Sequence, residues 1–203
     1  MRWLTVAVLL LLAPAALAAE VGKIAAVRGD VALIQAGERR TAAAGDALEP
    51  GDRVVTSARG MALLQLRGGL TLTVARDTEL VVGEPSAGPA RATMAGWLEV
   101  LEGLVRAVLS APAAAPAVQI ETPVAVTSVR STEWTVEHTA EAAHTAVFCR
   151  TGVVAVTAAG ATVTLGPGDG SDVRGEGAAP SAPVAWGAPR VADTLARSTF
   201  ATP

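Results

Sequence analysis

Short runs of Val, Leu, Ile and Thr recur from Val21 to Leu165. Gly, Asp or Pro interrupts these runs at spacings of about 8 to 12 residues, a pattern typical of all-β sandwiches and barrels. We therefore predict an all-β fold built as a layered β-sandwich or roll, or as a solenoid-like domain. The predicted strands cover residues 23–27, 30–35, 53–56, 62–66, 70–74, 79–82, 118–122, 124–129, 132–138, 145–150, 153–157 and 162–165.

The first 18 residues have the three parts of a secretory signal peptide. Arg2 precedes an apolar run from Leu4 to Leu12, and Ala16-Leu17-Ala18 supplies the small residues that a signal peptidase reads. The apolar run is shorter than the ~20 residues that a membrane-spanning helix needs, although an uncleaved anchor is the alternative. We predict cleavage after residue 18, a periplasmic or secreted product, and no stable membrane insertion afterwards.

The rest of the chain divides into an all-β domain at residues 19–169 and a segment at residues 170–203. Gly, Pro and Ala dominate residues 166–183, which predicts a loop or flexible linker. Beyond it, residues 191–198 are predicted to form a short helix, with Pro189 near its start.

Residues 95–109 fit two structures. Leu98, Leu101, Val105 and Val108 lie at helical spacing, which on periodicity alone predicts a helix. Gly103, in the middle of this segment, weakens the prediction of a helix.

The charge of the chain argues against nucleic acid as a partner. Removal of the signal peptide takes away Arg2 and no acidic residue, so the formal net charge falls from −3 to −4. Phosphate backbones require a clustered basic surface. The only adjacent basic residues are Arg39 and Arg40, and we expect them in a solvated turn.

Several motifs, in their order and spacing, resemble the FecR domain of bacterial envelope proteins. Residues 27–31 read Val-Arg-Gly-Asp-Val, and Gly51-Asp52 precedes a strand that ends in Thr56. The most specific motif is the Thr-Pro run at residues 122–132, in which Ser131 replaces the usual glycine. The resemblance covers residues 22–169. It implies an all-β domain without a known catalytic centre or cofactor, and it favours strand over helix at residues 95–109.

In the founding member of that family, a periplasmic part senses an outer-membrane siderophore transporter and a cytoplasmic part controls a sigma factor. The resemblance leaves three hypotheses for this chain. The first is a non-enzymatic module that binds a protein or glycan of the cell envelope, or has a structural role there. The second is a periplasmic sensory component that acts in trans on an outer-membrane transporter or membrane regulator. The third is a metal-dependent enzyme.

Four side chains are candidates for contact with a ligand or partner. Arg28 and Arg130 follow Val at corresponding positions of two strands, where each could instead bridge a neighbouring carboxylate. Trp97 and Trp186 are candidates because tryptophan is enriched at binding hot spots. Trp134 lies in a strand and is expected in the core.

His138, Glu141 and His144 are the one cluster with metal-ligand residue types. A hairpin centred on Glu141 would set the two histidines opposite one another at ~5 Å, and would place Trp134 beside Phe148. Structural zinc sites use four protein ligands and this cluster offers three, so an exposed polar rim is the alternative.

Cys149 is the sole cysteine and lies in an apolar strand, where it is expected to be a buried, unreactive thiol. A different pattern repeats twice, as Leu-x-Pro-Gly-Asp at residues 48–52 and 165–169. Pro-Gly favours a tight turn, and an aspartate that follows can accept backbone N–H bonds within it. We expect that role for Asp30, Asp46, Asp52 and Asp169. The repeat is either two similar turns or two related β-units.

Overall fold

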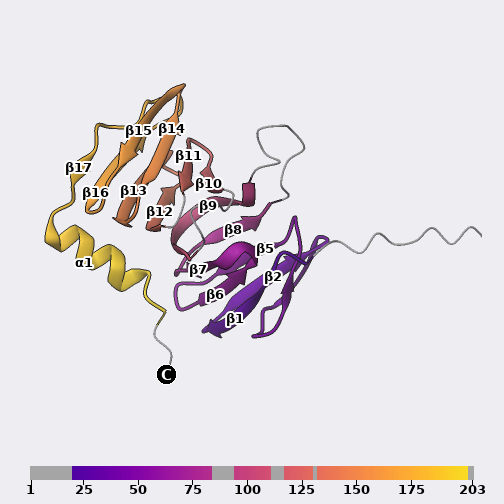
Figure 1. Cartoon of the computed structure of the whole chain (residues 1–203). Coiled ribbons are helices and arrows are strands. Elements are labelled where there is room, and N and C mark those ends of the chain that lie inside the picture. The colour runs from indigo at the N-terminus through magenta and orange to yellow at the C-terminus, as the bar shows by residue number, and fades with distance from the viewer. Residues whose placement is uncertain (1–19, 84–93, 111–116, 130–131, 201–203) are drawn as a thin grey trace, which may run out of the picture.

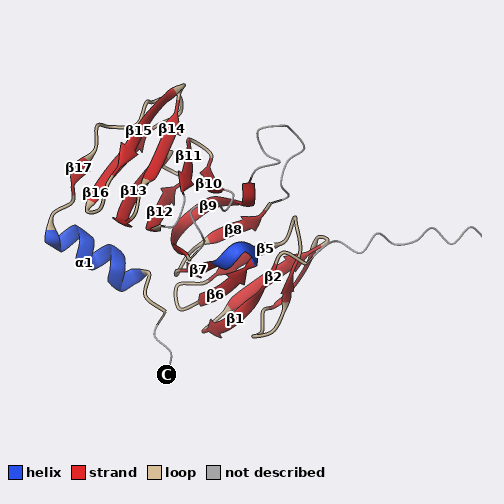
Figure 2. Cartoon of the chain, in the orientation of Figure 1, coloured by secondary structure: helices blue, strands red, loops and turns tan. Residues whose placement is uncertain are grey.

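A computed structural model describes residues 20–83, 94–110, 117–129 and 132–200 of the chain (Figure 1). The predicted signal peptide lies outside these residues. Strands dominate the described residues, with one short α-helix near the C-terminus (Figure 2). The all-β prediction is therefore confirmed.

The strands form two hydrogen-bonded sheets, which we name sheet A and sheet B. Both include part of β9 (Met94–Leu109). Across sheet A the order is β4 (Ala47–Leu48), β1 (Gly22–Arg28), β6 (Met61–Leu66), β7 (Leu70–Val74), β9, β12 (Glu133–Thr139), β13 (His144–Thr151), β16 (Asp169–Arg174) and β17 (Val184–Ala185). Across sheet B the order is β3 (Glu38–Thr41), β2 (Val31–Gln35), β5 (Arg53–Thr56), β8 (Glu79–Val82), β9, β10 (Ala117–Thr122), β11 (Ala125–Val129), β14 (Val154–Ala158) and β15 (Ala161–Leu165).

β9 passes from one sheet to the other, which settles the ambiguous segment as a strand. Its first half pairs with β8 and, in parallel, with β10, whereas its second half pairs with β7 and β12. Gly103 lies at the bend with a φ of 91°. A Cβ atom there would lie 2.5 Å from the Asp77 carbonyl oxygen and 2.3 Å from Thr78 Oγ1. Thr78 Oγ1 in turn accepts the N–H of Leu104 at 3.0 Å, so the bend is held by a buried hydroxyl.

One hydrophobic core lies between the two sheets. Inward-facing residues alternate with outward-facing ones along most strands, as in β10 and β14. Leu64 and Leu72 of sheet A and Leu33 and Leu80 of sheet B belong to the same buried cluster. Trp134 is fully buried in that cluster, as predicted.

Three Gly-Asp turns share one hydrogen-bond pattern. The carboxylates of Asp46, Asp52 and Asp169 each accept a backbone N–H from three residues earlier, at 2.8, 2.8 and 3.1 Å. This confirms the expected role for these three aspartates. The two Leu-x-Pro-Gly-Asp motifs are thus the same turn, but the strand that follows belongs to sheet B after Asp52 and to sheet A after Asp169.

The C-terminal segment departs from the sequence-based prediction. The expected linker at residues 166–183 contains β16, which pairs with β13 and buries Ser171, Asp172 and Val173. The boundary at residue 169 is therefore wrong, because the sheet continues through Arg174. Helix α1 (Ala188–Arg197) has Pro in its first turn, as expected, and lies against the outer face of sheet A (Figure 1).

A further difference concerns Arg39 and Arg40, which belong to edge strand β3 and not to a solvated turn. The turn itself is Ala36-Gly37, where both residues have positive φ, as a two-residue hairpin requires. Sequence analysis missed this hairpin because alanine rarely adopts the positive φ that Ala36 has here.

The bend in β9 can be tested by replacing its glycine. Gly103→Ala should lower the free energy of unfolding by about 1–3 kcal/mol more than Gly37→Ala, because the new methyl group has to displace backbone atoms of Asp77 and Thr78. Gly37 has a similar φ of 83° and nothing within 4 Å, so it isolates the cost of positive φ. Urea denaturation measures both variants. Equal losses of unfolding free energy in the two variants would mean that close packing at the bend contributes nothing to stability.

Candidate functional site

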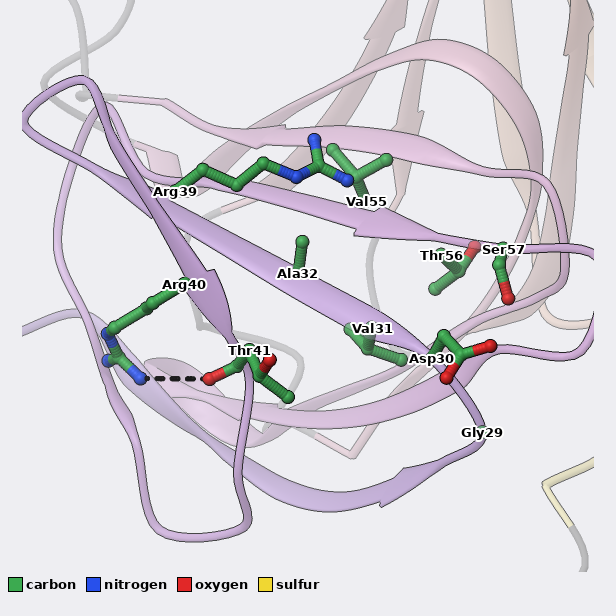
Figure 3. A pocket seen from close by; sticks show the side chains of 10 residues that line it. All are labelled: Gly29, Asp30, Val31, Ala32, Arg39, Arg40, Thr41, Val55, Thr56 and Ser57. Carbon is green, nitrogen blue, oxygen red and sulfur yellow. Dashed lines mark hydrogen bonds between the residues drawn. The ribbon is translucent and has the colours of Figure 1, made fainter.

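A groove of about 580 Å³ lies over the part of sheet B formed by β2, β3 and β5 (Figure 3). Its apolar floor includes Ala32 and Val55, which are paired on adjacent strands and face outward. Ten residues line the groove: Gly29, Asp30, Val31, Ala32, Arg39, Arg40, Thr41, Val55, Thr56 and Ser57.

Two arginines of β3 line one side of the groove and differ in their contacts. Arg40 donates to Asp46 at 2.7 Å and to Gln35 at 2.8 Å. The hydrogen bond with Asp46 raises the pKa of Arg40 and lowers the pKa of Asp46. Arg39 is exposed and makes no hydrogen bond or ion pair with any residue in the described ranges, and its side chain extends over the groove toward Val55 (Figure 3).

The opposite end of the groove is formed by the connection that precedes β2 and the connection that follows β5. The Ser57 N–H donates to the Asp30 carbonyl at 3.0 Å, which fixes the two connections together. Gly29 has a φ of 60° and a Cβ atom there would lie 2.1 Å from the Arg59 carbonyl oxygen. The groove thus combines the guanidinium of Arg39, an apolar floor and a polar end, and such a guanidinium can bind a carboxylate.

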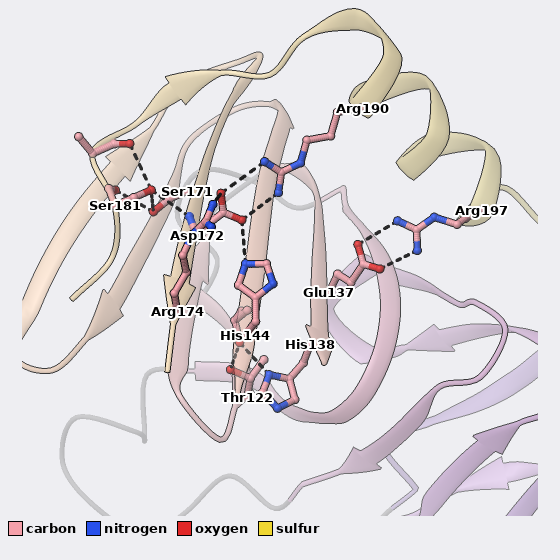
Figure 4. A network of polar contacts seen from close by, with 12 residues as sticks. Thr122, Glu137, His138, His144, Ser171, Asp172, Arg174, Ser181, Arg190 and Arg197 are labelled. Atoms are coloured by element: carbon pink, nitrogen blue, oxygen red, sulfur yellow. Dashed lines mark hydrogen bonds and ion pairs between the residues drawn. The ribbon is translucent and has the colours of Figure 1, made fainter. Parts of the chain in front are cut away.

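A second polar cluster lies between sheet A and helix α1 (Figure 4). Asp172 of β16 accepts hydrogen bonds from Arg190 at 2.8 Å and lies 3.0 Å from His144 Nε2. Burial alone would raise the pKa of Asp172, but the hydrogen bonds and charges of Arg190 and His144 outweigh it, so the pKa is lowered. Arg197 holds the other end of the helix through two hydrogen bonds to Glu137, at 2.6 and 2.9 Å.

Trp186 is part of this helix-docking surface. Its ring stacks on Phe148 at 5.0 Å between centroids, and the guanidinium carbon of Arg190 lies over the ring, 3.5 Å from its centroid. The side chain is 9% exposed. Trp186 therefore packs against residues of its own chain, and its contact with a partner stays a prediction.

The two histidines lie on opposite faces of sheet A, contrary to the predicted metal cluster. In the observed register His138 pairs with Thr145, and Thr139 pairs with His144. His138 is buried between the sheets, whereas His144 faces Asp172 beneath the helix, so the pair cannot share an ion. The same shift places Thr135, not Trp134, opposite Phe148.

Glu141 is exposed in the turn that joins β12 and β13. No group of three His, Cys, Asp or Glu side chains within the described residues could hold a metal ion. Glu102, near the same turn, accepts the Ala140 N–H at 2.7 Å.

The His138 ring is hydrogen-bonded to two buried threonine hydroxyl groups in series. Its Nδ1 lies 2.9 Å from Thr145 Oγ1, which lies 2.8 Å from Thr122 Oγ1 of sheet B. Burial lowers the pKa of His138 below its ordinary 6.5, despite the opposing charge of Glu102. A neutral His138 therefore joins the two sheets through polar contacts, which is a structural role.

Cys149 is fully buried beside Trp134, since the two residues are paired on adjacent strands. Burial and the nearby charge of Asp169 raise the pKa of its thiol to about 11. A thiol with that pKa is protonated at neutral pH, so it is not a nucleophile.

The remaining candidates are Arg28, Arg130 and Trp97. Arg28 ends β1 and is exposed. Arg130 lies outside the described residues. The backbone of Trp97 pairs with Gln119 of β10, within the first half of β9. Arg28, at the end of β1, and Trp186, next to β17, lie near opposite edges of sheet A, so the structure does not bring these two residues together.

Comparison with known proteins identifies the family. A family model described as FecR protein matches residues 52–155, slightly more than half of the chain, with β9 at its centre. The chain belongs to the FecR family. None of the curated proteins that were compared matches this FecR chain.

Two crystal structures, at 2.50 and 1.65 Å resolution, of a protein described as a "putative anti-sigma factor" from Parabacteroides distasonis ATCC 8503 resemble this FecR chain. Each is 17% identical with a TM-score of 0.58 and covers 70% of the present chain. The similarity spans 63% of that protein in one structure and 64% in the other. At this identity the similarity concerns the fold alone.

The groove beside Arg39 was missed because its residues are adjacent in space but not in sequence. Residues 29–32, 39–41 and 55–57 meet only when β2 pairs with both β3 and β5. The one sequence signal was the Arg39-Arg40 pair, and it would have pointed to the groove had β3 been recognised as a strand.

The buried histidine predicts a pH dependence of stability. The unfolded chain takes up a proton on His138 near pH 6.5, whereas the lowered pKa keeps the folded chain neutral there. Stability should therefore be fully present above pH 6.5 and decrease as pH falls from 6.5 toward the folded-state pKa, by at most about 1.4 kcal/mol per pH unit for one proton.

Urea denaturation between about pH 7 and pH 5 measures this slope. His138→Gln, which keeps a polar side chain, should be less stable at pH 7 but should lose part of the slope. His144→Gln is the matched control, since that ring lies on the other face of the sheet. A slope that persists in His138→Gln and vanishes in His144→Gln would contradict the assignment.

Proposed function

We propose that this FecR chain is a non-enzymatic sensory or regulatory component that is exported from the cytoplasm and acts in trans on another protein of the cell envelope. The observation that carries the proposal is the FecR match across both sheets. The fold shared with a protein described as a putative anti-sigma factor supports a regulatory role over a purely structural one.

A protein partner fits the described surface better than a glycan does. Glycan sites stack sugar rings on exposed aromatic side chains. Trp134, Phe148 and Trp186 are all buried within this chain. The groove instead presents the exposed guanidinium of Arg39 above an apolar floor, and arginine is enriched where proteins meet. We therefore assign the groove as the contact with the partner, an outer-membrane transporter or a membrane regulator.

The signal-peptide pattern at residues 1–18 supports a periplasmic location for this activity. Within the described residues, no helix has the length and hydropathy needed to span a bilayer.

The groove can be tested in the producing bacterium by complementation. Deletion of the gene should change transcription from a sigma-factor-dependent set of promoters, and the wild-type gene should restore it. Arg39→Glu should fail to restore it, because a carboxylate replaces the unpaired cation at the groove and would repel an acidic partner residue. We expect partner binding to weaken by at least about tenfold.

Arg67→Glu is the matched control, since Arg67 is another exposed arginine, on the β6–β7 turn and outside the groove. It should complement like the wild type. Periplasmic fractionation of both proteins confirms that they are exported alike. Full complementation by Arg39→Glu would refute the groove as the partner site, and recovery of the wild-type protein only from the cytoplasm would refute the proposed location.

A further inference from the structure

The outer edges of the two sheets differ in how they are protected against pairing with another chain. An edge strand presents unpaired backbone N–H and C=O groups, and proteins block such edges with charges, short strands or covering segments. In the described part of the chain, β4 and β17 end sheet A, and β3 and β15 end sheet B.

Three of these edges are blocked. β4 and β17 each contain only two residues. Next to β17, the Ser181 N–H donates to the Asp172 carbonyl at 2.9 Å, so the adjoining loop covers more of β16. Edge strand β3 reads Glu-Arg-Arg-Thr and is exposed along its length, so its charges oppose pairing with a like strand.

β15 is the unprotected edge. It reads Ala-Thr-Val-Thr-Leu, without charge, proline or glycine, and pairs only with β14. No backbone hydrogen bond joins it to any other described segment. Uncharged, β-branched edges of this kind are the ones that recruit another strand.

The hairpin that holds β15 determines which of its backbone groups face outward. Ala159 and Gly160 form a two-residue turn with φ of 47° and 75°, so Ala158 and Ala161 are the first hydrogen-bonded pair. Hydrogen-bonded and non-hydrogen-bonded pairs alternate along the ladder. The N–H and C=O groups of Thr162 and Thr164 therefore point away from β14.

This spacing is complementary to itself. If two copies of β15 pair antiparallel about Val163, Thr162 of each copy lies opposite Thr164 of the other, and both residues have outward-facing backbone groups. The two Val163 side chains then meet on the core-facing side, and threonines pair on the solvent side, where Thr162 and Thr164 are exposed. We propose that β15 is a homodimerisation edge, through which two copies of this chain join their B sheets into one continuous sheet.

Exposed apolar side chains flank the end of the same edge. Val153 and Val184 are each 53% exposed, and they are the large hydrophobic residues of the described chain that are most open to solvent. Val153 adjoins the pair of Val154 with Leu165, and Val184 pairs with Gly170, so both lie beside the turn that follows β15. A five-residue ladder buries less than a standard interface, so the dimer is weak and depends on concentration.

A pair of charge-swapped variants tests the register. Sedimentation equilibrium measures the dimerisation constant of the protein as purified from the cells that produce it. Protein concentrations of about 10 μM to 1 mM suit the weak association expected of a small interface. The wild type should dimerise. Thr162→Lys/Thr164→Lys and Thr162→Glu/Thr164→Glu should each dimerise at least about tenfold more weakly, since like charges then lie opposite one another. An equimolar mixture of the two variants should form the heterodimer.

The matched control is Gln65→Lys, which adds one positive charge at an exposed position of the interior strand β6 and should dimerise like the wild type. Circular dichroism of every variant should match the wild type, because the substituted threonines face solvent. A wild type that stays monomeric at about 1 mM overturns the proposal. So does a mixture of the charge-swapped variants that fails to associate, whether or not the groove at Arg39 binds a partner.

Discussion

The fold depends on a single strand that belongs to two sheets. β9 supplies the centre of sheet B with residues before Gly103 and the centre of sheet A with residues after it. Among the described strands, each sheet has four more strands on either side of β9, so the strand pairing that connects the N-terminal half of each sheet to its C-terminal half runs through β9. The bend needs a residue without a side chain, because Asp77 and Thr78 occupy the space where a Cβ atom would lie.

The histidines, the cysteine and several aspartates of the described chain make contacts that stabilise this architecture. His138 and Cys149 are buried and electrically neutral, and Asp172 is paired with Arg190 and His144. The aspartates of the Gly-Asp turns accept backbone N–H groups. The groove beside Arg39 lies outside this set of structural contacts, on the outer surface of sheet B. The proposed function assigns partner contact to that groove.

Sequence patterns predicted the strands of the core well, because runs of β-branched and apolar residues bounded by turn residues mark them, and several of them, such as β10, β11 and β14, alternate between buried and less buried residues. They failed where stability comes from partners distant in sequence: β16 reads Asp-Gly-Ser-Asp-Val-Arg and is a strand only because β13 pairs with it. The histidine cluster failed for a different reason. The turn after β12 closes one position later than expected, through positive φ at Ala143, and a shift of one residue moves a side chain to the other face. The groove was not predicted, because three separate segments form it and its one sequence signal, the Arg39-Arg40 pair, was assigned to a turn.

Native-state hydrogen exchange tests the central role of β9 most directly, because it reports the free energy of opening for individual amides. The amides of β6 in the N-terminal half, of β13 in the C-terminal half and of β9 between them should exchange with the same free energy, equal to that of global unfolding. This result is expected if the shared strand makes both halves one cooperative unit. A β13 that opens at a clearly lower free energy than β6, while β9 stays protected, would show two independent units and contradict the account.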